Sequence, residues 1–308
     1  MIYTLTLNPA IDYVVTLPGF CEGAVNRSTE EEMFFGGKGI NVSIILKRLG
    51  ISSTALGFTA GFTGEAIEQG LSEQGIAADF IRLARGNSRI NVKLRYQHET
   101  EINGSGPSVS QTDLHRLFQK MNAIQSGDIL VLAGSVPNSL PSDIYEQILS
   151  HLSDKGILFA VDAAGNLLTN VLKYRPFLIK PNHIELGEIF HTEITNPQQA
   201  AKYAAELQKQ GAVNVLVSMA EQGCVLLDEK GTVTAVKAPT GTVINSVGAG
   251  DSMLAGFIAG YLNRSDYVYA LALGTAAGSA TAFSKDLADK ELIEHLLEAV
   301  ICLNGFQG

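Results

Sequence analysis

The sequence predicts an α/β fold in which a mostly parallel β-sheet lies between two layers of helices, with a small second β-sheet beside it. Short apolar runs typical of buried strands alternate with longer segments in which apolar residues recur three and four positions apart. Residues 89–96 instead alternate polar and apolar side chains strictly. No repeat, charge block or low-complexity linker interrupts the chain, so we expect one domain over residues 1–308.

The expected strands are short and rich in β-branched, aliphatic or aromatic residues. The first covers residues 2–7 and ends at the turn Asn8-Pro9. Later buried strands are predicted at 129–133, 158–161, 177–179 and 213–217. Helices are predicted at 39–49, 64–74, 111–124, 142–152, 197–210 and 267–283. Strands that alternate with helices of this length predict a parallel sheet covered on both faces.

The alternating segment is expected to belong to a lid. Its polar side chains share one face of a strand, namely Arg89, Asn91, Lys93 and Arg95. Together with residues 12–17, which also alternate, it can form a small sheet that projects over the main body. The lid strands then come from about 12–35 and 88–103. An equally weighted alternative is a solvated edge strand whose cations discourage pairing with other chains.

Composition limits the classes of function. The apolar fraction of 46% and the charged fraction of 17% describe an ordinary globular protein. The net charge of -9 argues against a general affinity for nucleic acid or acidic membranes. Cys21, Cys224 and Cys302 have neither disulfide-framework nor zinc-ligand spacing, and we expect no signal peptide or membrane span. These features predict a cytoplasmic protein.

A glycine-rich turn ahead of a long apolar helix is the first candidate site. Residues 245–252 read Asn-Ser-Val-Gly-Ala-Gly-Asp-Ser. A helix start has unpaired N–H groups and partial positive charge, so it can hold an anion. Gly248 and Gly250 let the backbone approach, and Asp251 can take the proton of an attacking hydroxyl. The alternative is an ordinary capped helix, and Met253 in place of a third glycine excludes the dinucleotide-binding fingerprint.

Residues 36–41, Gly-Gly-Lys-Gly-Ile-Asn, repeat this pattern near the start of the chain. They do not form a Walker A loop, because Gly39 follows the lysine where that loop has serine or threonine. Lys38 and Asn41 are three residues apart on one helical face, so both can reach one ligand. A glycine turn with a solvated lysine is the alternative. The second glycine-led helix start at Gly248 favours a reaction between two phosphorylated molecules.

Polar residues also follow predicted strands. Asp12 follows the first strand and can accept hydrogen bonds from two sugar hydroxyls, with a turn-forming aspartate as the alternative. Asn182 and Glu185 follow the strand at 177–179 and could orient a Mg²⁺-bound water near the phosphates of a nucleotide, with a helix cap as the alternative. The spacing of histidines and serines supports neither a metallohydrolase nor a serine hydrolase.

Together these segments resemble the PfkB, or ribokinase-like, sugar kinase family. Residues 36–41 are similar to its first signature and residues 245–256 to its second, and the spacing and chain length also fit. Residues 4–12 and the segment Val25-Asn26-Arg27 are most similar to the phosphosugar branch of the family. The resemblance implies a ribokinase-like three-layer fold whose lid strands commonly form the contact of a homodimer.

The resemblance also implies roles for individual residues. Asp251 is implied as the base, and the amides of Gly248, Ala249 and Gly250 as the anion hole. Asp12 and Asn41 are implied to hold sugar hydroxyls, with Gly37 and Ser135 as further substrate contacts. Arg27, Lys38 and Arg89 are implied to grip the phosphate already on the substrate. Implied contacts to ATP are Lys180, Asn182, Glu185, Ser218, Glu221, Gly223, Asn245, Gly278 and Ser284, with Mg²⁺ on Asn182 and Glu185 through water. One departure is Ala220, where the nucleotide loop is expected to have glycine.

The implied activity is ATP-dependent phosphorylation of a ketose monophosphate, converting fructose 1-phosphate to fructose 1,6-bisphosphate. Phosphorylation of tagatose 6-phosphate to tagatose 1,6-bisphosphate is one alternative. A non-catalytic sugar-phosphate-binding protein of the same fold is another, and a nicotinamide-dependent oxidoreductase is disfavoured by the missing glycine. The implied ligands are ATP, Mg²⁺ and a phosphosugar, and we expect no nucleic acid or membrane partner.

Overall fold

The computed structural model describes residues 1–306, apart from the side chain of Glu99. The strands of its larger sheet are β1 (Ile2–Thr6), β4 (Ser53–Ala60), β5 (Ala77–Ala78), β6 (Ile81–Leu83), β9 (Ile129–Ala133), β10 (Leu158–Asp162), β11 (Leu178–Ile179), β12 (Asn214–Ser218), β13 (Cys224–Leu227) and β14 (Val233–Val236). Their order is β14-β13-β12-β11-β10-β9-β1-β4-β5, with β6 beside β4. Only the pairs β12–β13 and β13–β14 are antiparallel among those described, so the predicted mostly parallel sheet is confirmed.

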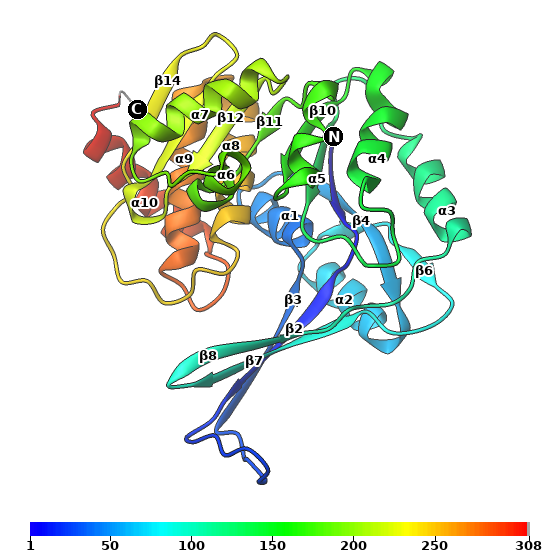
Figure 1. The fold of residues 1–308 in the computed structure, drawn as a ribbon. Coiled ribbons are helices and arrows are strands. Elements are labelled where there is room, and N and C mark those ends of the chain that lie inside the picture. Colours follow the sequence, from blue (N-terminus) through cyan, green and yellow to red (C-terminus); the bar gives the residue numbers. More distant parts are fainter. Residues whose placement is uncertain (307–308) are drawn as a thin grey trace.

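Helices cover both faces of this sheet (Figure 1). They are α1 (Lys38–Arg48), α2 (Gly61–Glu73), α3 (Gln111–Met121), α4 (Ile144–Leu152), α5 (Asn166–Thr169), α6 (His183–Phe190), α7 (Pro197–Lys209), α8 (Ala249–Arg264), α9 (Tyr267–Ala282) and α10 (Lys290–Asn304), with 3-10 turns η1 (Ser153–Lys155), η2 (Leu172–Tyr174) and η3 (Ala220–Gln222). No helix within residues 1–306 is long and apolar enough to cross a membrane.

The two helical layers follow from the alternation of side chains along the strands. In β9, Leu130 and Leu132 point into a core shared with α3, α4 and α7. Ile129 and Val131 point into a second core, shared with α1, α8, α9 and α10. Every residue of this strand is buried, as expected for a parallel strand covered on both faces. The predicted three layers are therefore confirmed.

Small residues allow α8 to lie deep in the second core, directly against α9. A side chain at Gly256 would lie 2.7 Å from the carbonyl oxygen of Leu273, and one at Gly274 would lie 2.8 Å from that of Met253. The helix backbones can approach this closely only because these positions lack a Cβ atom. The contact holds the first turn of α8 in a fixed position at the carboxyl ends of the strands.

A smaller sheet projects from the body (Figure 1). Its strands are β2 (Ala10–Thr16), β3 (Glu30–Gly36), β7 (Arg89–Tyr96) and β8 (His98–Asn103), in the order β3-β2-β7-β8. At the end nearest the body, Ile11 and Phe35 pack with Ile40 and Leu71, which belong to α1 and α2. The second, smaller sheet that the sequence predicts is therefore present, built from the two expected segments.

The exposure of β7 differs from the expectation of a solvated basic face. β7 pairs with β2 on one side and β8 on the other, so the edge-strand alternative is wrong. Its polar face is the covered one, because Asn91 and Lys93 are each 7% exposed while Ile90, on the opposite face, is 42% exposed. The charges satisfy one another across the strands, since Lys93 lies 3.7 Å from Asp12 and 3.8 Å from Glu101.

Candidate active site

The start of α8 has backbone donors free for a ligand. Gly248 precedes the helix with φ +80°, a left-handed conformation that glycine adopts without strain, and no side chain caps the helix. Ala249 N–H donates to Ser246 O at 3.3 Å. Within residues 1–306, nothing accepts a hydrogen bond from the amides of Gly250 and Asp251. These donors, at the positive end of the helix dipole, suit an anion.

The start of α1 is built in the same way. Gly37 precedes it with φ +129°, and a side chain there would lie 2.5 Å from the Cγ2 atom of Thr6. Ile40 N–H donates to the Thr6 hydroxyl at 3.0 Å. The amides of Lys38 and Gly39 have no acceptor in the described part of the chain. Side chains cap α3, α6, α7, α9 and α10, whereas α2, α4 and α5 have no side-chain cap, like α1 and α8.

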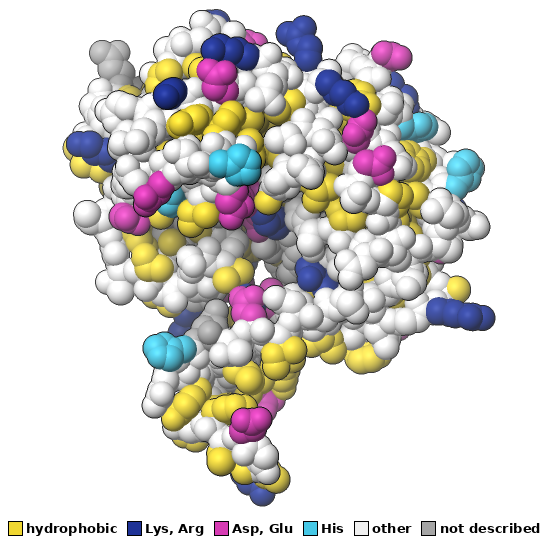
Figure 2. All heavy atoms as spheres, viewed as in Figure 1, with side chains coloured by type: hydrophobic (Ala, Val, Ile, Leu, Met, Phe, Trp, Pro, Cys, Tyr) yellow, Lys and Arg dark blue, Asp and Glu magenta, His cyan; other side chains and the backbone are white. Residues whose placement is uncertain are grey.

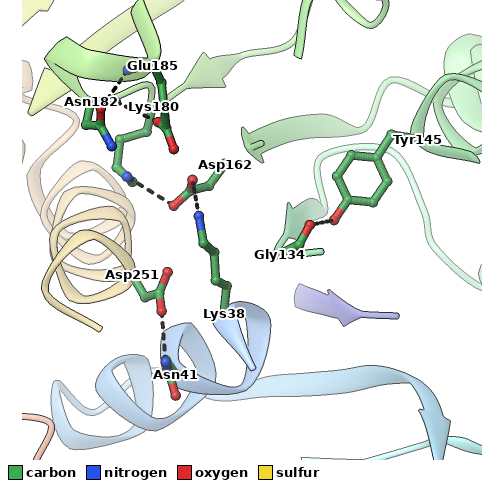
Figure 3. Close-up of polar contacts among 9 residues, drawn as sticks. All are labelled: Lys38, Asn41, Gly134, Tyr145, Asp162, Lys180, Asn182, Glu185 and Asp251. Carbon is green, nitrogen blue, oxygen red and sulfur yellow. Dashed lines mark hydrogen bonds and ion pairs between the residues drawn. The ribbon is translucent and has the colours of Figure 1, made fainter. Parts of the chain in front are cut away.

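The two helix starts converge at one carboxylate. Asn41 of α1 donates its amide hydrogen to the Asp251 carboxylate at 2.8 Å, although 210 residues separate them (Figure 3). Asp251 is 5% exposed. Burial, followed by repulsion from Asp162, raises the pKa of Asp251 to about 6. A carboxylate with this pKa is ionised at neutral pH yet basic enough to accept a proton.

Asp162 lies at the centre of the charged cluster. Its carboxylate is 3.1 Å from Lys38 Nζ and 3.0 Å from Lys180 Nζ, and the residue is 1% exposed (Figure 3). Burial alone would raise the pKa of Asp162, but Lys180 and Lys38 hold it below its usual value. Burial alone would lower the pKa of Lys38, but attraction to Asp162 and Asp251 raises it.

Sequence reasoning did not select Asp162. The same rule that selected Asp12 and Asn182 would have found it, because Asp162 ends the buried strand β10 at its carboxyl end. It also differs from its strand neighbours in being the only charged residue among Leu158–Asp162. Its importance depends on a tertiary contact with two lysines from other elements.

Asn182 and Glu185 form the start of α6 as a capping box. The Asn182 side chain accepts from the Glu185 N–H at 2.8 Å, and the Glu185 carboxylate accepts from the Asn182 N–H at 2.9 Å. The helix-cap interpretation is therefore correct for both residues. The second Glu185 carboxylate oxygen stays free of this box and lies on the same side as Lys180 and Asp162 (Figure 3). Ser218 is bridged to Asn182, so it borders the same corner.

A cavity of about 590 Å³ lies beside Lys38 and Asp162 and is also lined by Ser135. Gly134, the preceding residue, is held by the hydroxyl of Tyr145, which donates to its carbonyl oxygen at 3.0 Å. Tyr145 is fully buried, which raises the pKa of its hydroxyl. Figure 2 shows the body hollowed above the smaller sheet, with basic and acidic side chains along the hollow.

Asp12 and Arg89 lie at the end of the smaller sheet that leads into α1, since a side chain at Gly36 would lie 2.9 Å from Asp12 Oδ2. Arg89 of β7 is paired with Ala10 of β2. Its Nε–H donates to the carbonyl oxygen of Asn8 at 3.0 Å. Burial lowers the pKa of Arg89, and Asp12 opposes that change. The side chain of Asp12 is 18% exposed. Their contact with an acceptor sugar stays a prediction.

Arg27 does not join this cluster within one chain. It is exposed and belongs to residues 17–29, the tip of the smaller sheet farthest from the body (Figure 1). Arg89 is paired with Ala10 of β2, whereas the tip begins after Thr16 of the same strand. At a rise of about 3.3 Å per residue, Ala10 and Thr16 are about 20 Å apart. Within one chain, Arg27 is therefore too far away to bind the same phosphate as Lys38 and Arg89, and that part of the expectation is wrong.

The remaining predicted ATP contacts differ in their surroundings. Asn245 accepts from Val247 N–H at 3.0 Å and donates to Lys285 O at 3.1 Å, so it braces the turn before α8. Ser284 donates to Ala280 O at 2.8 Å at the end of α9. Gly278 is buried, and a side chain there would lie 3.0 Å from Ala249 O. Gly278 therefore packs closely against the α8 start, and its contact with a nucleotide stays a prediction.

Glu221 and Gly223 lie in and just after the turn η3. Glu221 is exposed, while Gly223 is buried with φ +92°, and a side chain at Gly223 would lie 1.9 Å from Val236 O. Ala220, the departure from the expected glycine, has φ +49°. The turn thus keeps the left-handed conformation that glycine would favour and places an alanine in it.

Comparisons with known proteins show the family of this chain. Residues 5–292 match the family described as pfkB family carbohydrate kinase. The 1-phosphofructokinase of Bacillus subtilis is 46% identical over 97% of this chain and 98% of its own length. The D-tagatose-1-phosphate kinase of Bacillus licheniformis is 38% identical over 94% of this chain and 95% of its own. Phosphofructokinase-2 of Escherichia coli, in complex with substrates and products, superposes with a TM-score of 0.89 at 28% identity over 97% and 99% of the chains.

Proposed function

The chain belongs to the pfkB family of carbohydrate kinases and is a phosphotransferase, and from this premise we propose that it phosphorylates a ketose 1-phosphate. The donor is ATP. The preferred acceptor in this proposal is fructose 1-phosphate, whose carbon 6 hydroxyl is converted to a phosphate ester to give fructose 1,6-bisphosphate. The name of the Bacillus subtilis relative supports this choice.

The hydrogen bond between Asn41 and Asp251 carries the proposal. It joins the first turn of α1 to the first turn of α8, each with free amides, at one buried carboxylate. Lys38 adds positive charge on the α1 side. A reaction that transfers a phosphoryl group from one phosphate-bearing molecule to another needs two anion sites and a base between them.

The chemistry follows from these positions. In the proposed reaction Asp251 accepts the proton of the acceptor hydroxyl while that oxygen forms a bond to the γ-phosphorus of ATP, and the bond from this phosphorus to the β-phosphate oxygen breaks. The amides of Gly248, Ala249 and Gly250 stabilise the charge of the transferring group. Lys38, Gly37 and Arg89 hold the phosphate already on the acceptor, and Asp12, Asn41 and Ser135 hold its hydroxyls.

The donor side is proposed to involve Lys180, Asn182, Glu185, Ser218, Glu221, Gly223, Asn245 and Ser284. Mg²⁺ fits this corner, because the Glu185 carboxylate has an oxygen outside its capping box and Mg²⁺ prefers oxygen ligands with several waters retained. Asn182 and Glu185 would hold the ion through water. When bound, Mg²⁺ offsets negative charge on the phosphates of ATP.

We also propose a homodimer through the smaller sheet. Its outer face exposes Met33 at 52%, Ile90 at 42% and Ile102 at 58%, which favours coverage by another apolar surface. A phosphate contact by Arg27 then requires the site of another copy, because Arg27 is remote from the cluster of its own chain. A cytoplasmic location is proposed from the cysteine usage and charge of the sequence.

The test is ADP formation with a panel of acceptors. Fructose 1-phosphate is expected to give the highest kcat/KM, ahead of fructose 6-phosphate and unphosphorylated fructose. D-tagatose 1-phosphate is the second candidate, because of the Bacillus licheniformis relative. Tagatose 6-phosphate tests the alternative in which the enzyme forms tagatose 1,6-bisphosphate. No ADP formation with any ketose phosphate, from a folded protein that binds them, would support the non-catalytic alternative instead.

A further inference from the structure

We propose that Asn91, on the covered face of β7, is a specificity residue that accepts a hydrogen bond from a secondary hydroxyl of the acceptor sugar. The sequence motifs gave Asn91 no role. This inference rests on the proposed function, since it concerns how that acceptor is selected. It adds a side-chain contact at the same site.

The strand register places Asn91 beside Asp12. β2 and β7 run parallel, with Asp12 opposite Asn91 and Ala10 opposite Arg89. Paired residues of neighbouring strands point to the same face of a sheet. Asn91 therefore lies on the same face as Arg89 and Asp12. On the opposite face, only the end nearest the body, with Ile11 and Phe35, packs on α1 and α2, while Ile90 is exposed.

Two observations fix the orientation of the Asn91 amide. Its Nδ2 atom donates to the Asp12 carboxylate at 2.7 Å. An ionised carboxylate can only accept hydrogen bonds, so the NH₂ group must face Asp12 and the Oδ1 atom must face away from it. Lys93 lies 3.7 Å from the other Asp12 oxygen, so each oxygen of that carboxylate faces a nitrogen group.

The Asn91 Oδ1 atom is buried and lacks a hydrogen-bond donor among residues 1–306. Asn91 is 7% exposed. A buried carbonyl oxygen without a donor is unfavourable, so a ligand hydroxyl that reaches it supplies a missing bond without first displacing a protein donor. The site is therefore prepared for a hydrogen-bond donor before the sugar arrives.

Asn91 and Asp12 together offer acceptors to neighbouring hydroxyls. The substrate class that fits is a sugar phosphate with adjacent secondary hydroxyls, which in a ketose 1-phosphate are those at carbons 3 and 4. A site built around acceptors discriminates strongly against an analogue without the donor, because the acceptor is then left unpaired. Asn91 is expected to select for the hydroxyl pattern, and Lys38 and Arg89 for the phosphate.

The experiment compares wild type, Asn91→Leu and Asn91→Ser on fructose 1-phosphate and on its 3-deoxy and 4-deoxy analogues. In wild type, one of the analogues should lose about 10- to 100-fold in kcat/KM. Asn91→Leu should raise the KM for fructose 1-phosphate by about 10- to 100-fold, with the KM for ATP changed less than about twofold. In Asn91→Leu, kcat/KM for the same analogue should be little lower than kcat/KM for fructose 1-phosphate, because the hydroxyl and its hydrogen-bond partner act as a pair.

Asn103→Leu is the matched control. Asn103 lies opposite Asn91 in the neighbouring strand β8 but is exposed. It should behave like wild type with every acceptor. If Asn91→Leu only disturbed the sheet, both leucine variants would lose activity alike, and each would still use the deoxy analogue less well than fructose 1-phosphate. That result would contradict the proposal.

The outcomes separate this inference from the proposed function. If wild type phosphorylates fructose 1-phosphate but uses both deoxy analogues equally well, the Asn91 contact is wrong and the proposed function stands. If wild type phosphorylates no ketose phosphate, the proposed function fails first. If Asn91→Leu does not fold, Asn91→Ser replaces it, with a smaller expected increase in the KM for fructose 1-phosphate. The data for wild type with the deoxy analogues then still test the Asn91 contact.

Discussion

The starts of α1 and α8 use the same backbone arrangement with side chains of opposite charge. Each follows a glycine with positive φ, lacks a side-chain cap and has unpaired amides in its first turn. Beside the amides of α1 lies Lys38, and beside those of α8 lies Asp251. A cation next to free amides makes a site that binds an anion, whereas a carboxylate next to them makes a site where a proton can be removed.

Asp162 makes the two regions interdependent. It pairs with Lys38 on the acceptor side and with Lys180 on the donor side, and it raises the pKa of Asp251. A side chain at Gly250 would lie 3.1 Å from Lys180 Nζ, so the donor lysine lies against the α8 start. One buried carboxylate thus positions both lysines and influences the base.

The largest effect is expected from Asp251→Asn. Asparagine keeps the size of the side chain but cannot take a proton, so kcat should fall by about 10²- to 10⁴-fold. The KM values for both substrates should change little, because the amides and lysines remain. Steady-state kinetics on protein with an unchanged far-ultraviolet spectrum measure this, and turnover within threefold of wild type would remove Asp251 from the role of base.

On the α1 side, Lys38→Met should act mainly on binding. The KM for the ketose phosphate should rise by about 10- to 100-fold because a charge-assisted contact to its phosphate is lost. The KM for ATP should change less. Lys290→Met, at a lysine whose side chain is 51% exposed, is the matched control and should match wild type. Equal increases in the KM for the ketose phosphate and the KM for ATP would contradict the proposal that the α1 start binds the acceptor and the α8 start binds the phosphates of ATP.

The link between the regions is tested by Asp162→Asn. The base must be ionised, so kcat/KM should rise with pH through the Asp251 pKa of about 6. Asp162 raises that pKa, so its neutralisation should move the acidic limb of the profile to lower pH. At neutral pH, kcat/KM should also fall about 10-fold as the lysines lose their partner. The acceptor phosphate titrates equally in both enzymes, so an unshifted limb would exclude the link.

The smallest effect is expected at Ala220, on the donor side. Ala220→Gly should stabilise the protein by about 0.5–1 kcal/mol, because alanine is strained at φ +49° and glycine is not. Ala201→Gly, inside the helix α7, should destabilise it by a similar amount. Denaturant unfolding measures both. A loss of stability in Ala220→Gly would show that the turn has no strain to release.

Elements with strong local patterns were predictable from sequence. The strand at 89–96 coincides with β7, and the helix predicted at 39–49 is α1 at Lys38–Arg48. β4, Ser53–Ala60, escaped prediction because its serine, threonine and glycine content lacks the usual apolar signal, and Gly57 has φ +145°. β8 escaped because His98–Asn103 is mostly polar.

The candidate site was predictable where a motif lies next to a helix start. Asp251, Lys38 and Asn41 were found in this way, and their convergence is present. Asp162 and Asn91 were not found. Asp162 meets the strand-end rule, but its importance, like that of Asn91, depends on partners that lie 124 and 79 residues away in sequence. The orientation of β7 also required the structure, since alternation identifies two faces without telling which one the body covers.

The most direct test of the opposed helix starts is a crystal structure with ADP, a planar phosphate mimic and fructose 1-phosphate. We expect the mimic at the amides of Gly248, Ala249 and Gly250, the acceptor phosphate at Lys38 and Arg89, and the carbon 6 hydroxyl about 2.6–3.2 Å from an Asp251 oxygen. An acceptor phosphate bound away from α1, with Asp251 out of reach of any sugar oxygen, would contradict the account.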